Sequence, residues 1–192
     1  MTGQSQRLSR CFKKPPIVAY KQPKNLGDIL IRAKVVGKRR SVRKKAGWAL
    51  CKRLCKLCIL SKPTKTHSCR RTGKIWKINH HIDCQTKNVV YKLTCKKCPL
   101  WGPYIGKTKR AFCERVQEHR GYISQWATTK NPKIRKHPIG IHFNGPGHSV
   151  ADLLPIAIEK VFPEDKPNTL TNRESYWINM YDSASFGANT RD

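Results

Sequence analysis

The sequence predicts an α+β domain, and two observations support that prediction. Short apolar runs of strand length are followed by longer segments in which apolar residues recur every three or four positions, the spacing of one helix face. In chain order these segments give a hairpin, a helix, a strand and a helix, with no internal repeat beyond two cysteine-rich clusters. Such an order is typical of an α+β domain.

Each element after Asn88 has its own signal. The first strand is an apolar run at residues 89–93, and the second lies around Tyr104 and Ile105. A loop rich in proline and glycine, from Pro132 to Gly147, separates the first helix from the last strand. The first helix, the last strand and the last helix are expected at about Lys109 to Gln125, Leu153 to Val161 and Leu170 to Tyr181.

Composition divides the chain into three parts. Residues 1–47 are expected to form a basic connector or arm, with a short helical candidate from Leu26 to Val35. Residues 48–87 are dense in cysteine and histidine, which predicts a zinc-binding lobe. Residues 88–192 carry the globular pattern of the α+β domain.

The charge of the chain indicates a polyanionic partner. Forty Lys and Arg against eleven Asp and Glu give 192 residues a formal net charge of +29. Nucleic acid is the first candidate, and DNA binding of this kind should weaken steeply with salt, because bound phosphates release counterions. Ribosomal proteins share the same signature, so charge alone does not separate DNA from RNA.

A basic run from Lys34 to Lys45 holds seven Lys or Arg in twelve positions. It fits an arm on the nucleic-acid backbone or a nuclear-import signal, and a solvated tail is the alternative. We expect a nuclear location from this run. The expected nucleic-acid-binding residues are Lys38, Arg39, Arg40, Arg43, Lys44 and Lys45.

Cysteine usage points to metal. The chain shows no apolar run of membrane-spanning length, and residues 1–10 lack the apolar core of a signal peptide, so we expect an intracellular protein with no membrane partner. Nine cysteines in a reducing compartment are more typical of metal ligands or buried thiols than of disulfides.

Two clusters have the spacing of zinc ligands. Cys95 and Cys98 have a two-residue gap between two expected strands, and His142 and His148 are separated by five residues that include glycines and a proline. The alternative is a pair of buried thiols with two surface histidines. Upstream, Cys55 and Cys58 have a second two-residue gap, in a basic setting. Spacing leaves the other half of that site ambiguous, and the candidates to complete it are Cys51, Cys69, Cys84 and His81.

Polar residues on the two long helices predict a reactive site. Glu174 interrupts an apolar helix face, and a divalent cation such as Mg²⁺ is a natural partner for a carboxylate there. Arg115 and His119 are four residues apart, so they are neighbours on the earlier helix. Phosphodiester hydrolysis needs a cation on the phosphate, a base for water and help for the leaving oxygen.

The available residues meet these needs. Arg115 would bind the scissile phosphate through a bidentate fork. Tyr91 or Tyr104, with His119 nearby, would accept the proton of the attacking water. A phenol titrates near pH 10, so a close cation must lower its pKa, and Lys107 is a candidate. Asn189 would orient a tyrosine or the phosphate.

Together these residues resemble the GIY-YIG nuclease family, and within it the endonuclease module of Penelope-like retroelements. Two segments resemble the core motif of the family, Val89-Val90-Tyr91 and Tyr104-Ile105-Gly106-Lys107-Thr108. The family's further motif residues are matched by Arg115, His119, Glu174 and Asn189. The likeness extends to the Cys95 and Cys98 pair, the segment from His142 to His148, and an upstream set of Cys51, Cys55, Cys58 and Cys84.

This resemblance implies a fold and an activity. The fold would be a short mixed or antiparallel sheet flanked by helices, with an N-terminal zinc-binding lobe and two structural zinc ions. The activity would be an Mg²⁺- or Mn²⁺-dependent endonuclease that nicks one DNA strand and exposes a 3′ hydroxyl for target-primed reverse transcription. An RNA template and a reverse transcriptase domain or chain would be further partners.

The sequence departs from the family in two respects. Val89 stands where the family motif has glycine, and the 192 residues contain no reverse transcriptase. A catalytically inactive, zinc-stabilised nucleic-acid-binding protein on the same fold is the alternative function. A ribosome-associated structural protein is a third.

Overall fold

The computed structural model describes residues 45–51, 55–99, 101–162 and 168–189. Residues 44–192 form one compact unit. The expected helix from Leu26 to Val35 lies outside the described residues, as do the basic residues Lys38, Arg39, Arg40, Arg43 and Lys44. Lys45 is described and exposed, and its carbonyl lies 3.2 Å from Nδ1 of His81.

A three-stranded antiparallel sheet forms the centre of this unit. Strand β5 (Val89–Cys95) lies between β6 (Tyr104–Thr108) and β7 (Leu153–Lys160). All three strands were predicted. In the register of the sheet, Tyr91 stands opposite Gly106 on β6 and Ala157 on β7. Because Tyr91 lies on the middle strand of the sheet, its side chain can contact residues of both neighbouring strands and of the helix that covers them.

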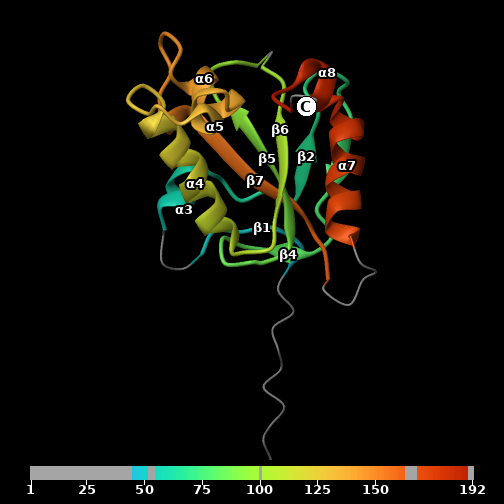
Figure 1. Cartoon of the computed structure of the whole chain (residues 1–192). Coiled ribbons are helices and arrows are strands. Elements are labelled where there is room, and N and C mark those ends of the chain that lie inside the picture. Colours follow the sequence, from blue (N-terminus) through green and yellow to red (C-terminus); the bar gives the residue numbers. More distant parts are fainter. Residues whose placement is uncertain (1–44, 52–54, 100, 163–167, 190–192) are drawn as a thin grey trace, which may run out of the picture. The chain divides into compact units, whose positions relative to one another are not determined.

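The two long helices cover opposite faces of this sheet (Figure 1). Helix α4 (Phe112–Gln125) packs Phe112 into the core that contains Tyr91, and helix α7 (Thr169–Tyr181) packs Trp177 into the core that contains Val90. Successive strand residues point to opposite faces, so this division follows from the strand geometry. The α+β class is therefore confirmed. No helix among the described residues is long and apolar enough to span a membrane.

The cysteine-rich segment contains elements that the sequence did not predict. They are short, and isolated elements of this length have no periodicity to detect. Strands β1 and β4 pair in parallel, and β2 and β3 pair antiparallel. Their bounds are β1 (Gly47–Trp48), α3 (Lys56–Leu60), β2 (Thr66–Ser68), β3 (Ile75–Lys77) and β4 (His81–Ile82).

This segment shares its core with the rest of the unit. Trp48 lies edge-on against Phe112 of α4, with ring centroids 5.4 Å apart, and its indole N–H donates to Ser61 at 2.8 Å. Leu57 and Leu60 belong to the same buried cluster as Tyr91. The expected boundary between residues 87 and 88 therefore does not separate two compact units, because the lobe buries its apolar residues against α4.

The expected loop after α4 instead contains two short helices. Helices α5 (Pro132–Arg135) and α6 (Pro138–Phe143) each begin with a proline, which suits the first helical position because its nitrogen needs no partner there. Asn131 and His137 cap them by accepting backbone N–H groups. A 3₁₀ turn (Val150–Asp152) leads into β7, and α8 (Ser183–Phe186) follows α7.

Candidate active site and metal clusters

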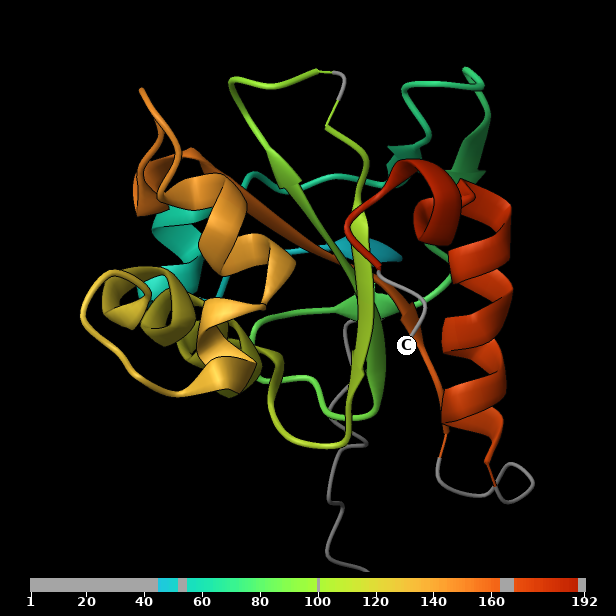
Figure 2. The same ribbon diagram turned by 45° about the horizontal axis from the view of Figure 1, so that its top comes forward.

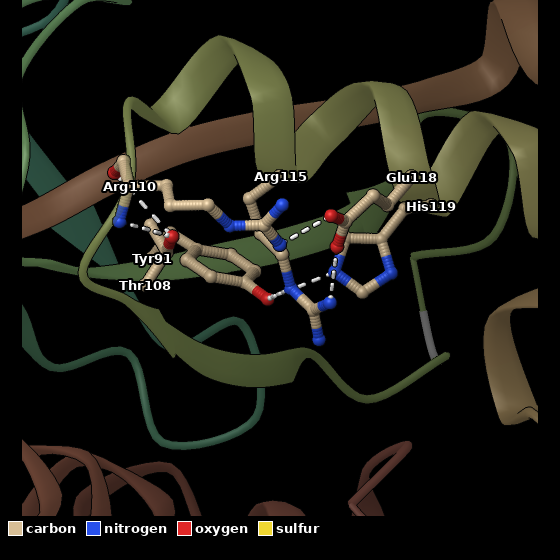
Figure 3. Close-up of polar contacts among 6 residues, drawn as sticks. All are labelled: Tyr91, Thr108, Arg110, Arg115, Glu118 and His119. Carbon is tan, nitrogen blue, oxygen red and sulfur yellow. Dashed lines mark hydrogen bonds and ion pairs between the residues drawn. The ribbon is translucent and has the colours of Figure 1, made fainter.

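Tyr91 is the centre of a hydrogen-bonded cluster on the α4 face of the sheet (Figure 3). Its side chain is fully buried. The Nε–H of Arg115 donates to the phenol oxygen at 3.0 Å, and Nε2 of His119 lies 2.8 Å from the same oxygen. The structure thus brings together three of the predicted residues, because Arg115 and His119 lie one helical turn apart above β5.

The protons of this cluster can be placed from its donors. Arg115 can only donate, so the single phenol proton of Tyr91 is directed to Nε2 of His119. Burial raises the pKa of Tyr91 above its ordinary range, which keeps the phenol protonated. Burial, with the charge of Arg115, holds the pKa of His119 well below its ordinary value. His119 is therefore neutral with its proton on Nδ1, which has no hydrogen-bond partner among the described residues.

Gly106 leaves the space that Tyr91 occupies. A Cβ atom at Gly106 would lie 2.5 Å from Oη of Tyr91 and 2.6 Å from its Cζ. These distances are too short for any side chain, so the glycine of the Tyr-Ile-Gly segment is needed for close approach of the ring. Tyr104 lies beside the same ring, with centroids 6.4 Å apart.

Two aromatic residues near Tyr104, His137 and Tyr122, were not predicted from the sequence. His137 lies 5.6 Å from the Tyr104 ring and 4.8 Å from the Tyr122 ring, and 5.5 Å from His119. Burial and the charge of Arg115 lower the pKa of His137 to about 4, so it is also neutral near pH 7. Nothing in the sequence linked His137 to the strands, because a loop brings it there.

Glu118 is a third residue that was missed. It accepts hydrogen bonds from Arg110 and, at 2.6 Å, from Nη1 of Arg115 (Figure 3). Partial burial raises the pKa of Glu118, but hydrogen bonds and charge from both arginines outweigh it and leave the pKa lowered. The i,i+3 spacing to Arg115 was a signal that could have found this carboxylate.

Lys107 does not have the role that was predicted for it. Its ammonium pairs with Oε2 of Glu174 at 2.8 Å and donates to Thr171 at 3.0 Å. The cation beside Tyr91 is Arg115, and burial still raises the pKa of both Tyr91 and Tyr104. The expected lowering by Lys107 is therefore absent from this structure. Lys107 instead joins β6 to α7 next to the predicted metal ligand.

Asn189 also differs from its predicted role. Its amide oxygen accepts from the N–H of Ile105, and its amide nitrogen donates to the carbonyl of Ile105, both at 2.7 Å. β6 is an edge strand, and Asn189 satisfies its outward backbone groups as a further strand would. The segment after α8 lies along β6 for this reason (Figure 2). Asn189 thus positions the backbone between Tyr104 and Gly106.

The structure brings together all four predicted ligands at the end of β5. Cys95, Cys98, His142 and His148 place their possible ligand atoms within 4.8 Å of one another, so the cluster could hold a metal ion. Nε2 of His142 is buried and has no hydrogen-bond partner among the described residues. Nδ1 of His148 lies 2.9 Å from the Pro146 carbonyl, which leaves Nε2 facing Sγ of Cys98 at 3.0 Å.

The upstream cluster resolves the ambiguity in the sequence. Cys51, Cys55, Cys58 and Cys84 also place their sulfurs within 4.8 Å of one another and could hold a second metal ion. Cys69 belongs to the core on the α7 face. His81, the other alternative, lies near Asp83.

A search of protein-family models, of curated proteins and of solved structures finds no match to this chain.

Proposed function

We propose that this protein is a metal-dependent DNA endonuclease of the GIY-YIG type, closest to the module of Penelope-like retroelements. It would nick one strand by phosphodiester hydrolysis and leave a 3′ hydroxyl. The observation that carries the proposal is the hydrogen-bonded chain of Arg115, Tyr91 and His119 beside Tyr104, with Glu174 across β6. Packing alone rarely buries two phenols, an imidazole and a guanidinium against one another.

Arg115 has the donors that a scissile phosphate requires. A guanidinium has five N–H groups, and the contacts to Tyr91 and Glu118 use two of them. Its side chain is 23% exposed, so the remaining donors are within reach of a substrate. The two protein contacts fix the plane of the fork before the substrate binds, which reduces the cost of reorganisation in the transition state.

Exposure separates the two phenols. Tyr91 is fully buried and already makes two hydrogen bonds, whereas Tyr104 is half-buried. We assign the water-facing base to Tyr104 and a positioning role to Tyr91, which holds Arg115 in place. The neutral imidazoles of His119 and His137 flank Tyr104, with ring centroids 5.4 and 5.6 Å from its ring. To accept the proton of the attacking water, Tyr104 must be a phenolate; the charge of Arg115 favours that form, whereas burial opposes it and leaves the pKa of Tyr104 raised.

Glu174 is the carboxylate that would hold Mg²⁺ or Mn²⁺. Its side chain is 19% exposed, and one or two carboxylates with substrate phosphate and water are the usual ligands of Mg²⁺. Lys107 pairs with this carboxylate in the free protein, and a bound metal ion would share or replace that positive charge. When bound, the metal would lower the pKa of a water molecule and stabilise the leaving oxygen.

Both cysteine clusters suit structural zinc. Thiolates bound to one tetrahedral zinc at about 2.3 Å lie roughly 3.8 Å apart. In the upstream cluster, Sγ of Cys58 lies 3.5 Å from Sγ of Cys51 and 3.6 Å from Sγ of Cys55. The His148 contact to a backbone carbonyl is the usual second partner of a metal-bound imidazole. Elemental analysis of the purified protein should find two zinc ions per chain, and a protein without zinc would contradict both sites.

The cellular setting follows from the same proposal. A 3′ hydroxyl made at a nick can prime DNA synthesis, so an RNA template and a reverse transcriptase domain or chain are the expected partners, in the nucleus. The net charge of +29 supports DNA as the substrate but also suits the alternative, a zinc-stabilised binding protein without catalysis.

Nicking of supercoiled plasmid in Mg²⁺ or Mn²⁺ separates these two functions. We expect wild-type protein to nick, and Glu174→Gln to abolish nicking while DNA binding is largely kept, because the variant loses the metal ligand and not the basic surface. Glu114→Gln, an exposed carboxylate on α4, is the matched control and should nick normally. A wild-type rate in Glu174→Gln would refute the metal role, and wild-type protein that binds without nicking would favour the alternative.

A further inference from the structure

A groove of about 800 Å³ lies on the face of the central sheet opposite Tyr91. Lys92 and Thr94 of β5 and Ile156 of β7 contribute to its lining. The other walls come from the segment between α3 and β2, the connection between β5 and β6, and the ends of α7 and α8. Because Tyr91 and Lys92 are consecutive strand residues, this groove is separated from the catalytic cluster by the sheet itself.

The lining of the groove carries charge of one sign. Five of its residues are Lys or Arg, and none is Asp or Glu. Three aromatic side chains, Trp101, Tyr181 and Phe186, are also part of it. Phe186 is 60% exposed, and the guanidinium of Arg71 lies over one face of its ring at 4.3 Å from the ring centre. The basic residues are Lys62, Arg70, Arg71, Lys92 and Lys96.

Lys92 is the least usual of these residues. Its side chain is only 7% exposed, and the one hydrogen bond of its ammonium goes to the Ser68 carbonyl at 2.9 Å. The ring of Tyr181 lies 5.2 Å away, as in a cation–π contact. Among the described residues no carboxylate pairs with this ammonium. A buried charge is normally paired, because its desolvation is costly.

Among the described residues, Arg71 is the one cation of the groove that has a carboxylate partner. Arg71 pairs with Asp182 at 2.8 Å, and Lys96 donates to the Ala151 carbonyl at 3.1 Å. Arg70 and Lys62 are exposed and have no ion pair in the part of the chain that the structure describes. Lys92, Arg70 and Lys62 therefore bring positive charge without a carboxylate partner to the lining of the groove, and Arg70 is close enough for its charge to act on Lys92.

We propose that this groove binds a single strand of nucleic acid, with a backbone phosphate at Lys92 and Arg70 and a base on the exposed ring of Phe186. A phosphate would supply the counter-charge that Lys92 lacks. Aromatic rings that line a basic groove are the usual platform for unpaired bases. A duplex fits this groove less well, because its bases are stacked inside the helix and cannot pack on Phe186. Its phosphates lie on a convex surface, which cannot reach Lys92 on the floor of the groove, where that residue is only 7% exposed.

This proposal goes beyond the nuclease and does not depend on it. A strand held behind the sheet would lie apart from the strand at Tyr91 and Arg115. The groove would therefore add a second nucleic-acid site, whose occupant is unpaired while the catalytic face acts on a phosphodiester. Binding and nicking can be measured separately, so failure of one proposal is distinguishable from failure of the other.

Fluorescence anisotropy of a labelled oligothymidylate tests the groove, in the Glu174→Gln background so that no cleavage occurs. A strand of about 8 nucleotides is within the usual site size of such grooves. We expect Lys92→Met and Phe186→Ala each to weaken binding at least about fivefold, the lower end of what one base stack contributes. The slope of log affinity against log salt should fall by about 0.7 for Lys92→Met and stay unchanged for Phe186→Ala.

Lys133→Met is the matched control, because it removes an exposed charge from α5, which does not line the groove. It should weaken binding less than Lys92→Met. Plasmid nicking by Lys92→Met in the active background should keep its saturated rate. Oligothymidylate affinity unchanged in both groove variants would overturn the proposal. Equal competition by a duplex of the same length, or by a polyglutamate peptide, would also overturn it, since the groove would then recognise charge alone.

Discussion

Tyr91 and Lys92 are neighbours on β5, yet the cations buried on the two sides of the sheet differ in whether a carboxylate pairs with them. On the Tyr91 face the guanidinium of Arg115 has an acidic partner in Glu118. On the other face the buried ammonium of Lys92 pairs with no carboxylate among the described residues. The first face is preorganised by its own contacts, and the second is left for a ligand to complete.

This difference predicts how each face responds to mutation. Side chains that hold one another in place lose function when one is removed, because the others lose their orientation. A buried charge without a counter-charge costs stability in the free protein, so its removal should weaken binding and stabilise the fold. Variants of the two faces should therefore move activity and stability in different directions.

Arg115→Ala should give the largest effect, and it acts on the Tyr91 face alone. We expect the nicking rate at saturating DNA to fall by roughly 10²–10³, as when one preorganised oxyanion donor is removed. Arg115→Lys should recover only part of this loss, because the bidentate fork is gone. Arg120→Ala on the same helix is the control, and single-strand binding in the groove should not change in any of the three. Full activity in Arg115→Lys would show that a point charge is sufficient.

Gly106→Ala tests the packing of the same face and should have a smaller effect. The new Cβ would lie 2.5 Å from Oη of Tyr91, so the phenol must move away from Arg115 and His119. Overpacking of this kind costs about 1–3 kcal/mol of stability, which thermal unfolding would detect. Gly121→Ala is a sharp control, because nothing lies within 4 Å of its Cβ and alanine is favoured in a helix. Equal unfolding temperatures in the two variants would contradict the close approach.

The sequence predicted the elements with a long repeat and the residues with a fixed spacing. Strands β5, β6 and β7 and helices α4 and α7 carry clear periodicity, and the two-residue gaps of Cys95 and Cys55 located both metal clusters. The strands of two and three residues around the upstream cluster have no such signal. Trp48 of β1 packs on Phe112 of α4, and His67 of β2 packs on Trp177 of α7, and both contacts join residues that are distant in sequence.

The site was predicted less completely than the clusters. Glu174 was proposed because a charged residue interrupts an apolar helix face, and Lys92 carries the same signal inside an apolar strand but was not recognised. Asn189 was identified from the motif, but its two backbone hydrogen bonds depend on how the segment after α8 returns to β6. The type and position of a residue in the sequence thus indicated that it matters, but the contact that defines its role could be seen only in the folded structure.

Lys92→Met should give the smallest effect on stability, and its dependence on pH identifies the cause. Burial, with the nearby charge of Arg70, lowers the pKa of Lys92 to about 8 from its ordinary 10.5. Below pH 8 the ammonium is charged in both the folded and the unfolded chain, so the penalty for burying it is fully present. Between about pH 8 and 10.5 the unfolded chain binds more protons at this site, and the stability of the wild type rises relative to the variant.

The stabilisation of Lys92→Met over wild type should therefore be clear near pH 7 and shrink towards pH 10. Each kcal/mol shifts the unfolding temperature by about 2–4 °C in a chain of this size, so calorimetry at the two pH values can resolve the trend. Other groups titrate in the same range, but they do so in both proteins and cancel in the difference. Lys133→Met, exposed on α5, should show no such trend. A gap between Lys92→Met and wild type that stays constant or widens with pH would mean that Lys92 already has a counter-charge, and the contrast between the two faces of β5 would then fail.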